Sequence, residues 1–305
     1  MGLLGTATVT VVGLTCKAFL NSGLCAVTVN GLHYLKTALE DTARRSAGQG
    51  VVTICNHIST LDDPVTWGVL PARYHLNPRT TRWALGASDI MFTNPLFSTF
   101  FSLGQTLETF RGEGIYQAAV DTAIHKLNDG HWVHLYGEGK VNQPDTYLKD
   151  SLGRACLPRF KWGVGRILME ASVPPVVIPM WITGFEQLMP EGRPFLYKYL
   201  PRIGARLSIT FGEPVPADEL REALAVSKSD ADVDASAAAD QPGDLTGWLG
   251  KEGQRRYDTG AAASYDDHVY AALIRQKVTA IIHRDVQALG RSVSGKLLTG
   301  FKSDS

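Results

Sequence analysis

Short apolar runs rich in β-branched residues recur along the chain and alternate with segments whose apolar positions follow helical spacing. This pattern predicts strands over residues 51–55, 82–87, 105–110, 131–136, 175–181 and 205–211. It predicts helices from about 36 to 45, after Pro95, and over about 113–128, 161–171 and 266–289. Strands that alternate with helices in this way indicate an α/β fold, with a central and mostly parallel sheet flanked by helices.

Two further apolar segments suit a membrane. Residues 1–35 carry one full charge, Lys17, and no acid. A spanning helix needs about 20 predominantly apolar residues, and Lys17, Asn21 and Ser22 interrupt this stretch, so we expect a membrane-interface segment rather than a span. Residues 91–103 hold four Phe, and this composition fits a core helix and an apolar lip that touches lipid equally well.

The sequence pattern also divides the chain into a domain, an insertion and a tail. Residues 226–262 are dominated by Ala, Ser, Asp, Gly and Gln, which predicts a disordered acidic insertion. We therefore expect one α/β domain formed by residues 36–225 and 263–292, followed by a flexible tail over 293–305.

The charged residues are distributed unevenly along the chain. The 305 residues include 30 basic and 30 acidic side chains, and this balance argues against a broad nucleic-acid-binding surface. Residues 213–267, however, hold 13 acidic and 5 basic side chains, which leaves 25 basic and 17 acidic elsewhere. The bulk of the protein is thus basic and favours an anionic substrate or an anionic membrane surface. The four cysteines lack CxxC spacing, and we expect them to be reduced.

The strongest chemical signal is NHISTLDD, residues 56–63, directly after the predicted strand 51–55. His57 could act as a general base if Asp62, five residues later, accepts a hydrogen bond from one imidazole nitrogen. The alternative is structural, with Asp62 or Asp63 as a helix N-cap before Pro64 and His57 as an ordinary loop histidine.

Two more polar turns follow predicted strands. Arg111 and Gly112 leave the strand 105–110 before a helix, a position suited to binding a phosphate. In YGEGKVN, residues 136–142, Glu138 and Lys140 supply an acceptor and a cation, and Gly139 allows close backbone approach. The ends of parallel strands meet at one edge of a sheet, so we expect these turns to converge there.

These residues resemble the HxxxxD glycerolipid acyltransferase family. His57 and Asp62 match its first motif, Arg111 lies in the second, Glu138 and Gly139 in the third, and Pro179 in the fourth. One departure is Gly137, where the family usually has Pro. The DDP after the first motif and the GKVN after the third resemble the branch that exchanges acyl chains between phospholipids without CoA.

The resemblance implies catalysis by His57 and Asp62, and substrate binding by Arg111, Gly112, Glu138, Gly139, Lys140 and Pro179. It implies neither metal nor cofactor, phospholipid and lysophospholipid substrates such as phosphatidylcholine and monolysocardiolipin, and a peripheral or monotopic place on a mitochondrial membrane, outer or inner, facing the intermembrane space. Three alternatives stay open: an acyl-CoA-dependent acyltransferase, a non-catalytic membrane-remodelling protein, and a metal hydrolase using His131 and His134. Strand geometry disfavours the third, because residues three apart on a strand point to opposite faces. The sequence also leaves open whether the chain forms a homo-oligomer.

A run of cations follows the third motif. Lys149, Arg154, Arg159, Lys161 and Arg166 lie within 18 residues and are opposed by Asp150 alone. We expect these side chains either to dock on anionic lipid or to form a solvated helix face.

Overall fold

A computed structural model describes residues 2–194, 200–224 and 265–299. The predicted insertion 226–262 and the end of the predicted tail lie outside the described residues. The strands are β1 (Ala26–Asn30), β2 (Val51–Cys55), β3 (Trp83–Ala87), β4 (Thr106–Thr109), β5 (Trp132–Tyr136), β6 (Val176–Thr183) and β7 (Arg206–Phe211).

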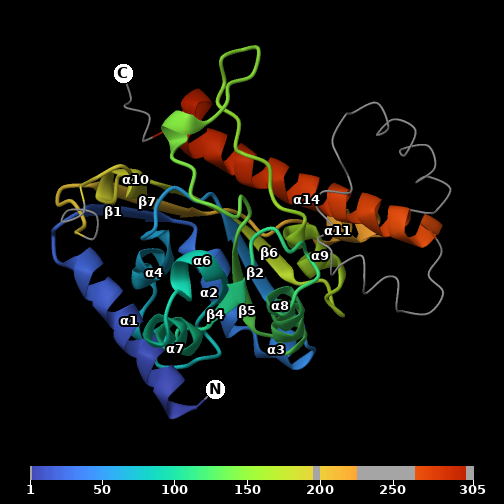
Figure 1. Ribbon diagram of the computed structural model, residues 1–305, viewed down its shortest axis with the longest axis horizontal. Coiled ribbons are helices and arrows are strands. Elements are labelled where there is room, and N and C mark those ends of the chain that lie inside the picture. The colour runs from blue at the N-terminus through green and yellow to red at the C-terminus, as the bar shows by residue number, and fades with distance from the viewer. Residues whose placement is uncertain (1, 195–199, 225–264, 300–305) are drawn as a thin grey trace.

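The helices alternate with these strands (Figure 1). The α-helices are α1 (Leu3–Asn21), α2 (Leu32–Glu40), α3 (Thr42–Ser46), α4 (Asp62–Val65), α5 (Ala72–His75), α6 (Ser88–Met91), α7 (Pro95–Leu103), α8 (Ala118–Asn128), α9 (Gly163–Met169), α10 (Phe185–Leu188), α11 (Ala217–Leu224) and α14 (Tyr265–Ser294). Short 3₁₀ turns are η1 (Thr66–Val69), η2 (Pro144–Thr146) and η4 (Gly295–Leu297).

Within the described residues the strands form one seven-stranded sheet in the order β1-β7-β6-β2-β5-β3-β4. Strands β6, β2, β5, β3 and β4 run parallel to one another, whereas β7 is antiparallel to β6 and parallel to β1. The predicted α/β fold with a central, mostly parallel sheet is confirmed. Because β2 lies in the middle of the sheet, the loop after it is flanked by neighbouring strands on both sides.

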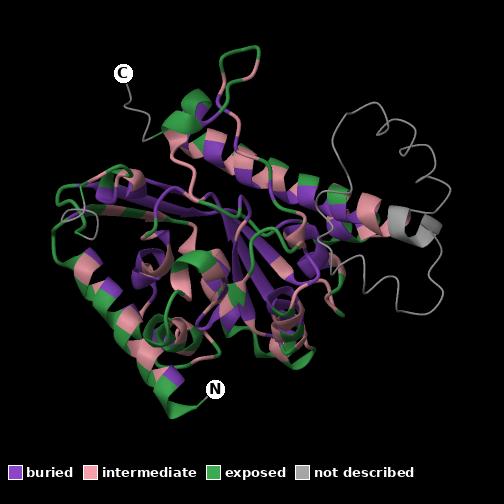
Figure 2. Cartoon of the chain, in the orientation of Figure 1, coloured by how far each residue is buried: buried purple, intermediate pink, exposed green. Residues whose placement is uncertain are grey.

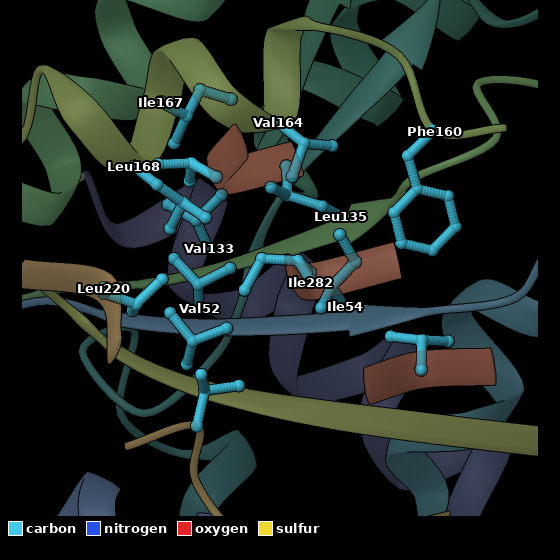
Figure 3. Packing of buried hydrophobic residues seen from close by; sticks show 14 of the residues in the cluster. Val52, Ile54, Val133, Leu135, Phe160, Val164, Ile167, Leu168, Leu220 and Ile282 are labelled. Atoms are coloured by element: carbon cyan, nitrogen blue, oxygen red, sulfur yellow. The ribbon is translucent and has the colours of Figure 1, made fainter. Parts of the chain in front are cut away.

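The two faces of the sheet carry separate hydrophobic cores. Helices α8, α9, α11 and α14 pack on one face, against residues such as Val52, Ile54 and Val133 (Figure 3). Helices α1, α2 and α10 pack on the other face, which includes Val51 and Cys55. Successive side chains of a strand point to opposite faces, so β2 is covered on both sides, and all five of its residues, including Thr53, are buried.

Strand β1 was missed by the pattern. Its residues alternate between exposed and half-buried, as an edge strand does, and it lies inside the stretch 1–35 that we expected at a membrane interface. The strand pairs with β7 over Ala26–Asn30. The apolar N-terminal helix is therefore confined to Leu3–Asn21, and the chain after it joins the sheet.

Helix α1 is, among the described helices, the one whose length and composition would allow it to cross a membrane. It lies along the domain and packs against η1, α4, α5 and α7 (Figure 1). Two of its polar side chains point inward, since Thr10 Oγ1 donates to the His75 carbonyl at 2.8 Å and Lys17 Nζ donates to the Leu70 carbonyl at 3.0 Å. Gly13 allows the close approach of His75, whose Nδ1 would lie 2.2 Å from a Cβ there.

Helix α7 lies at the surface. None of its nine residues is buried, although most of them are apolar. The expectation of a core helix over residues 91–103 is therefore wrong, and the apolar lip is the form that the structure takes.

Candidate active site

His57 and Asp62 form a hydrogen-bonded pair just beyond the carboxyl end of β2. Nδ1 of His57 lies 2.8 Å from Oδ2 of Asp62, and the same oxygen accepts the backbone N–H groups of Ile58 at 2.7 Å and Ser59 at 2.9 Å. A carboxylate is an acceptor only, so Nδ1 is the donor and Nε2 carries the lone pair. The His57 side chain is 20% exposed and that of Asp62 is fully buried, so His57 is the member that a substrate can reach.

Burial raises the pKa of Asp62, and the hydrogen bonds from His57, Ile58 and Ser59 oppose that rise. The local fold explains why the pair forms. Asp62 begins α4, and the chain between it and His57 turns tightly enough for Asp62 N–H to donate to the Ser59 carbonyl at 3.2 Å. The five-residue spacing thus lets one carboxylate hold both the loop and the imidazole.

Glu138 fixes the same loop from the neighbouring strand β5. Its Oε1 accepts the backbone N–H of His57 at 2.8 Å, and its Oε2 accepts Nδ2 of Asn142. The His57 carbonyl in turn accepts the Asn142 N–H at 2.7 Å. Both backbone groups of His57 are therefore held by residues 138–142. The resemblance implied that Glu138 binds substrate, but the structure engages both carboxylate oxygens with protein groups.

The Glu138 side chain is almost completely buried, and burial raises its pKa to about 8, although the bonds from His57 and Asn142 oppose the shift. Burial thus favours the neutral form of this carboxyl group more than in a solvated glutamate. A neutral Glu138 still accepts both hydrogen bonds, because each oxygen keeps a lone pair after protonation.

Two residues that the sequence analysis did not single out complete the support of His57. Tyr136, the last residue of β5, stacks on the imidazole with ring centroids 4.1 Å apart and planes inclined by 21°. Asn56 is fully buried and joins β2 to β6, because its side chain donates to the Ile182 carbonyl at 3.0 Å and accepts the Ile182 N–H at 2.9 Å. A buried Asn directly after an apolar strand is the signal that could have found this clamp.

Arg111 lies on an exposed turn after β4. Its Nη1 donates to Oδ2 of Asp89 on α6 at 3.2 Å, and both side chains are about half exposed. The turn is held by Gln117, whose Oε1 accepts the Phe110 N–H at 2.8 Å and whose Nε2 donates to the Gly114 carbonyl at 2.6 Å. Gly112 has a φ of 84°, a left-handed conformation that favours glycine.

The three polar turns lie at the same edge of the sheet, and two of them, the His57 loop and the Glu138 turn, follow the adjacent strands β2 and β5. Strands β5 and β3 separate β2 from β4, so the Arg111 turn starts about 14 Å from the His57 loop at the usual strand spacing. The charge of Lys161 interacts with that of Arg111 in the second motif and with that of Lys140, which follows the third motif. Burial, followed by the positive charges of Lys140 and Arg111, lowers its pKa. The edge therefore combines an imidazole–carboxylate pair with three cations.

Comparison with known proteins agrees with this geometry. The acyltransferase family model matches residues 26–183, which include β1 to β6 and every residue of the His57 loop. The chain belongs to the acyltransferase family.

Individual acyltransferases narrow the assignment. A protein named Taffazin from Dictyostelium discoideum is 35% identical over 253 residues, covering 82% of this chain and 78% of that one. Tafazzin of Drosophila melanogaster is 39% identical over 176 residues, 58% of this chain and 43% of the relative. An N-acylphosphatidylethanolamine synthase of Arabidopsis thaliana is 37% identical over 194 residues, 62% and 64% of the two chains. The protein is thus a tafazzin-like acyltransferase.

Pro179 of the fourth acyltransferase motif lies inside the sheet. It is buried within β6, opposite Ile54 of β2, and it stands where β6 changes from parallel pairing with β2 to antiparallel pairing with β7. A proline has no N–H for a sheet ladder, and the change of partner is a position where that loss is tolerated. The substrate contact implied for Pro179 stays a prediction, and the contacts that the structure gives this residue lie within the sheet.

Gly137, the departure from the usual acyltransferase motif, is explained by packing. A Cβ at this position would lie 2.5–2.6 Å from three ring atoms of Phe160, which is closer than non-bonded carbons approach. The Gly137 carbonyl accepts the Lys161 N–H at 2.7 Å, so the segment that carries Phe160 is bonded to the turn. The ring of Phe160 occupies the space that a larger residue would fill.

The cation run after the third motif does not form one lipid-facing cluster. Arg166 is buried and binds Asp121 at 2.6 Å, Glu170 at 2.9 Å and the Ile115 carbonyl at 2.7 Å. Arg154 pairs with Asp150 at 2.7 Å. Counting charges along the sequence overlooked these acidic partners, two of which lie outside the run.

Asp63 serves the fold rather than the imidazole. Burial raises its pKa, but the charge and hydrogen bonds of Arg82 outweigh burial and leave the pKa below its usual value. Asp63 and Arg82 line a cavity of about 130 Å³ between α1 and α7, and Trp67 and His75 also line it.

Within the ranges that the structure describes, no group of three His, Cys, Asp or Glu side chains could hold a metal ion. All four cysteines are unpaired, as expected.

Proposed function

We propose that this acyltransferase transfers an acyl chain from a phospholipid to a lysophospholipid without CoA, and that His57 is its general base. The observation that carries the proposal is the His57–Asp62 pair. A buried carboxylate holds Nδ1–H at 2.8 Å, and the imidazole itself is partly exposed. This arrangement gives Nε2 a free lone pair and stabilises the positive charge that His57 acquires on taking a proton.

The chemistry balances with two lipids alone. Nε2 of His57 removes the proton of the lysophospholipid hydroxyl, and the oxygen attacks the ester carbonyl carbon of the donor. The tetrahedral intermediate collapses, the old ester bond breaks, and the imidazolium returns the proton to the departing glycerol oxygen. One ester forms as another breaks, so no energy source is consumed. General-base assistance of this kind supplies about 10²- to 10⁴-fold in rate.

Arg111, Gly112, Gly139 and Lys140 are proposed to bind the head-group phosphates. The Arg111–Asp89 pair is exposed, and such pairs contribute about 0–1 kcal/mol. A lipid phosphate, which offers a guanidinium two parallel hydrogen bonds, competes readily with Asp89. Lys140 is exposed beside the Glu138 turn, and Lys161 adds a third positive charge.

Glu138 is proposed to position His57 rather than to touch substrate. It holds the His57 N–H, and its own partners leave neither oxygen free in this structure. The glycerol backbone would then lie between the imidazole and the Arg111 turn.

We further propose monolysocardiolipin as acceptor, phosphatidylcholine as donor, and a mitochondrial membrane facing the intermembrane space as the location. These specifics come from the resemblance of the DDP and GKVN segments. The basic charge outside residues 213–267 is consistent with an anionic acceptor.

The test offers purified protein a labelled phosphatidylcholine and monolysocardiolipin in bilayers that contain no CoA. We expect labelled cardiolipin with the wild type and none with His57→Ala. A matched control is His33→Ala, because His33 is a histidine of α2 outside the site. Unchanged transfer by His57→Ala would overturn the proposed base.

Three further arms separate the alternatives. Transfer that appears only when acyl-CoA is added would indicate the CoA-dependent reaction. Because one curated relative is named for N-acylation of phosphatidylethanolamine, that lipid is offered as a competing acceptor. Membrane remodelling that is equal for wild type and His57→Ala would indicate a non-catalytic protein.

A further inference from the structure

The ring of Tyr136 covers one face of the His57 imidazole. Strand β5 is buried from Trp132 to Leu135, as its neighbour β2 is, and Tyr136 is its half-buried last residue (Figure 2). Tyr136 pairs with Cys55 in the sheet, and His57 follows Cys55 by two residues. The imidazole thus lies on the Tyr136 ring, with centroids 4.1 Å apart and planes inclined by 21°.

This stack acts on the charge that His57 acquires. The face of an aromatic ring carries negative potential and attracts a cation within about 6 Å of its centroid. His57 becomes such a cation when Nε2 takes the proton of the substrate hydroxyl. Asp62 stabilises the positive charge from the edge of the imidazole, through Nδ1–H, and Tyr136 stabilises it from the face.

The Tyr136 ring stays neutral in this position. Burial raises the pKa of its phenol well above the ordinary value, and the negative charges of Asp63 and Asp62 raise it further. Among the residues that the structure describes, the Tyr136 hydroxyl makes no hydrogen bond, so the ring is the part of the side chain that contacts His57. Phenylalanine would therefore preserve the contact.

His134 holds the Tyr136 ring from the other side of the stack. The two rings meet edge to face, with centroids 4.4 Å apart and planes inclined by 86°. His134 is 1% exposed, and burial lowers its pKa to about 3, so it is neutral. Neither the imidazole–carboxylate pair nor the phosphate-binding turns use this buried histidine.

Hydrogen bonds fix the tautomer of His134. Trp132 Nε1–H donates to Thr53 Oγ1 at 2.8 Å, which leaves the Thr53 hydroxyl hydrogen for Nδ1 of His134, also at 2.8 Å. A neutral imidazole that accepts at Nδ1 carries its hydrogen on Nε2. In the part of the chain that the structure describes, Nε2 has no hydrogen-bond partner. It lies instead among the rings of Tyr136 and Trp67, and aromatic electrons are a weak acceptor for an N–H.

We propose that Tyr136 is a positioning residue for His57, whose ring face stabilises the imidazolium formed during acyl transfer, and that His134 holds this ring in place. The inference rests on the proposed function, because it deepens the account of the same base. The bonds that form and break are unchanged, and the ring alters only the stability of the protonated imidazole.

The experiment replaces Tyr136 with phenylalanine and with phenylalanines that carry one, two or three fluorine atoms. Fluorine withdraws electrons from the face of the ring but hardly changes its size, so the attraction for a cation weakens while the packing stays. We expect Tyr136→Phe to keep a kcat near that of the wild type. Across the fluorinated series kcat should fall stepwise, by about 5- to 30-fold in all, with KM unchanged. A constant kcat would overturn the proposal.

Phe211 supplies the matched control. It is a buried phenylalanine at the end of β7, and β6 separates β7 from the His57 strand β2. The same fluorinated residues at position 211 should leave kcat unchanged. A fall equal to that at position 136 would show that fluorine acts through the core, which would also overturn the proposal.

A second measurement reads the stack without turnover. Protons that lie over an aromatic ring resonate upfield, and ring-labelled histidine makes those of His57 visible by NMR, with His57→Ala to assign them. We expect the upfield shift in the wild type and in Tyr136→Phe, and its loss in Tyr136→Leu. In His134→Leu the shift and kcat should both decrease. Unshifted wild-type signals would overturn the stack, and a wild-type result for His134→Leu would overturn the role of His134.

The two sets of results distinguish this proposal from the proposed function. Full activity of His57→Ala contradicts the proposed base, whereas the NMR shifts still report on the stack. An inactive His57→Ala together with a constant kcat across the fluorinated series contradicts the role of Tyr136 alone.

Discussion

The buried carboxyl group of Glu138 accepts the backbone N–H of His57 at 2.8 Å, so the third acyltransferase motif holds the main chain of the first. The bond joins the loops after two adjacent parallel strands, β5 and β2. A change at Glu138 therefore acts on the position of the imidazole.

From this relationship we predict opposite results for two substitutions of Glu138. Glu138→Gln keeps an acceptor for the His57 N–H, and Asn142 can turn its amide to face the new side chain, so most activity should remain. Glu138→Ala leaves that N–H unsatisfied, which costs about 1–3 kcal/mol, and should reduce kcat strongly. Urea unfolding and steady-state kinetics check both. Equal kinetics for the two variants would contradict the positioning role.

The raised pKa of Glu138 predicts a dependence of stability on pH. In the unfolded chain this carboxyl group ionises near 4.5, and in the folded protein near 8. Between these values the folded state binds one more proton, so its stability should fall by about 1.4 kcal/mol for each unit that the pH rises. Glu138→Gln lacks this contribution. Urea unfolding from pH 5 to 9 should show the gap between variant and wild type widening in favour of the variant, and a constant gap contradicts the shift.

Two substitutions of Asp62 separate its effect on His57 from its effect on folding. Asp62→Ala removes the acceptor of two buried N–H groups as well as the partner of His57, so stability and activity should both fall. Asp62→Asn keeps an oxygen for the backbone but removes the negative charge that stabilises the imidazolium. We expect a kcat about 10²- to 10⁴-fold lower with a smaller loss of stability. Thermal unfolding and kinetics separate the two effects, and an active Asp62→Asn variant would rule out the charge as the cause.

Gly137 and Phe160 form a packing pair that a double substitution tests. Gly137→Ala places a methyl group against the Phe160 ring and should cost about 1–3 kcal/mol. Phe160→Leu should relieve most of that cost in the double variant. Gly163→Ala is the control, because no atom lies within 4 Å of a Cβ there. Additive effects of Gly137→Ala and Phe160→Leu in urea unfolding would show that the two residues are independent.

The docking of α1 depends on Gly13. Leu at this position cannot coexist with His75 in its present place, so Gly13→Leu should separate α1 from the domain. Hydrogen exchange across residues 3–21 should then rise toward that of an isolated helix. Ala7→Leu, on the exposed side of the same helix, should leave exchange unchanged. Strong protection in Gly13→Leu would mean that α1 is held by other contacts.

The residues that the sequence could place are those whose signal is local. The β-branched run VVTIC predicts β2, and the five-residue spacing between His57 and Asp62 predicts their bond, because one loop contains the whole relationship. Strand β1 could not be found, since its edge position leaves no continuous apolar signal.

Long-range partners explain the other differences. Judged by its neighbours in the sequence, Arg166 is a surface cation, yet Asp121, 45 residues away, pairs with it. Judged by its motif, Glu138 is a substrate ligand, yet the fold brings to it the N–H of His57, which is 81 residues away in the sequence. Pro179 matches a family motif, but its register opposite Ile54 places it inside the sheet. No pattern within a short window contains these contacts.

The attachment of α1 along the domain has a consequence for lipid composition. A helix that crossed the bilayer would leave the catalytic domain free to move on a tether, whereas α1 is held by η1, α4, α5 and α7 along its length. Under the proposed function, a domain resting on a bilayer through this helix would sample only the leaflet on which it rests, and donor and acceptor would come from that same leaflet. Repeated exchange would then equalise acyl chains among the lipids of one monolayer and leave the opposite monolayer unchanged, so that membrane sidedness, as much as pocket chemistry, decides which lipids are remodelled.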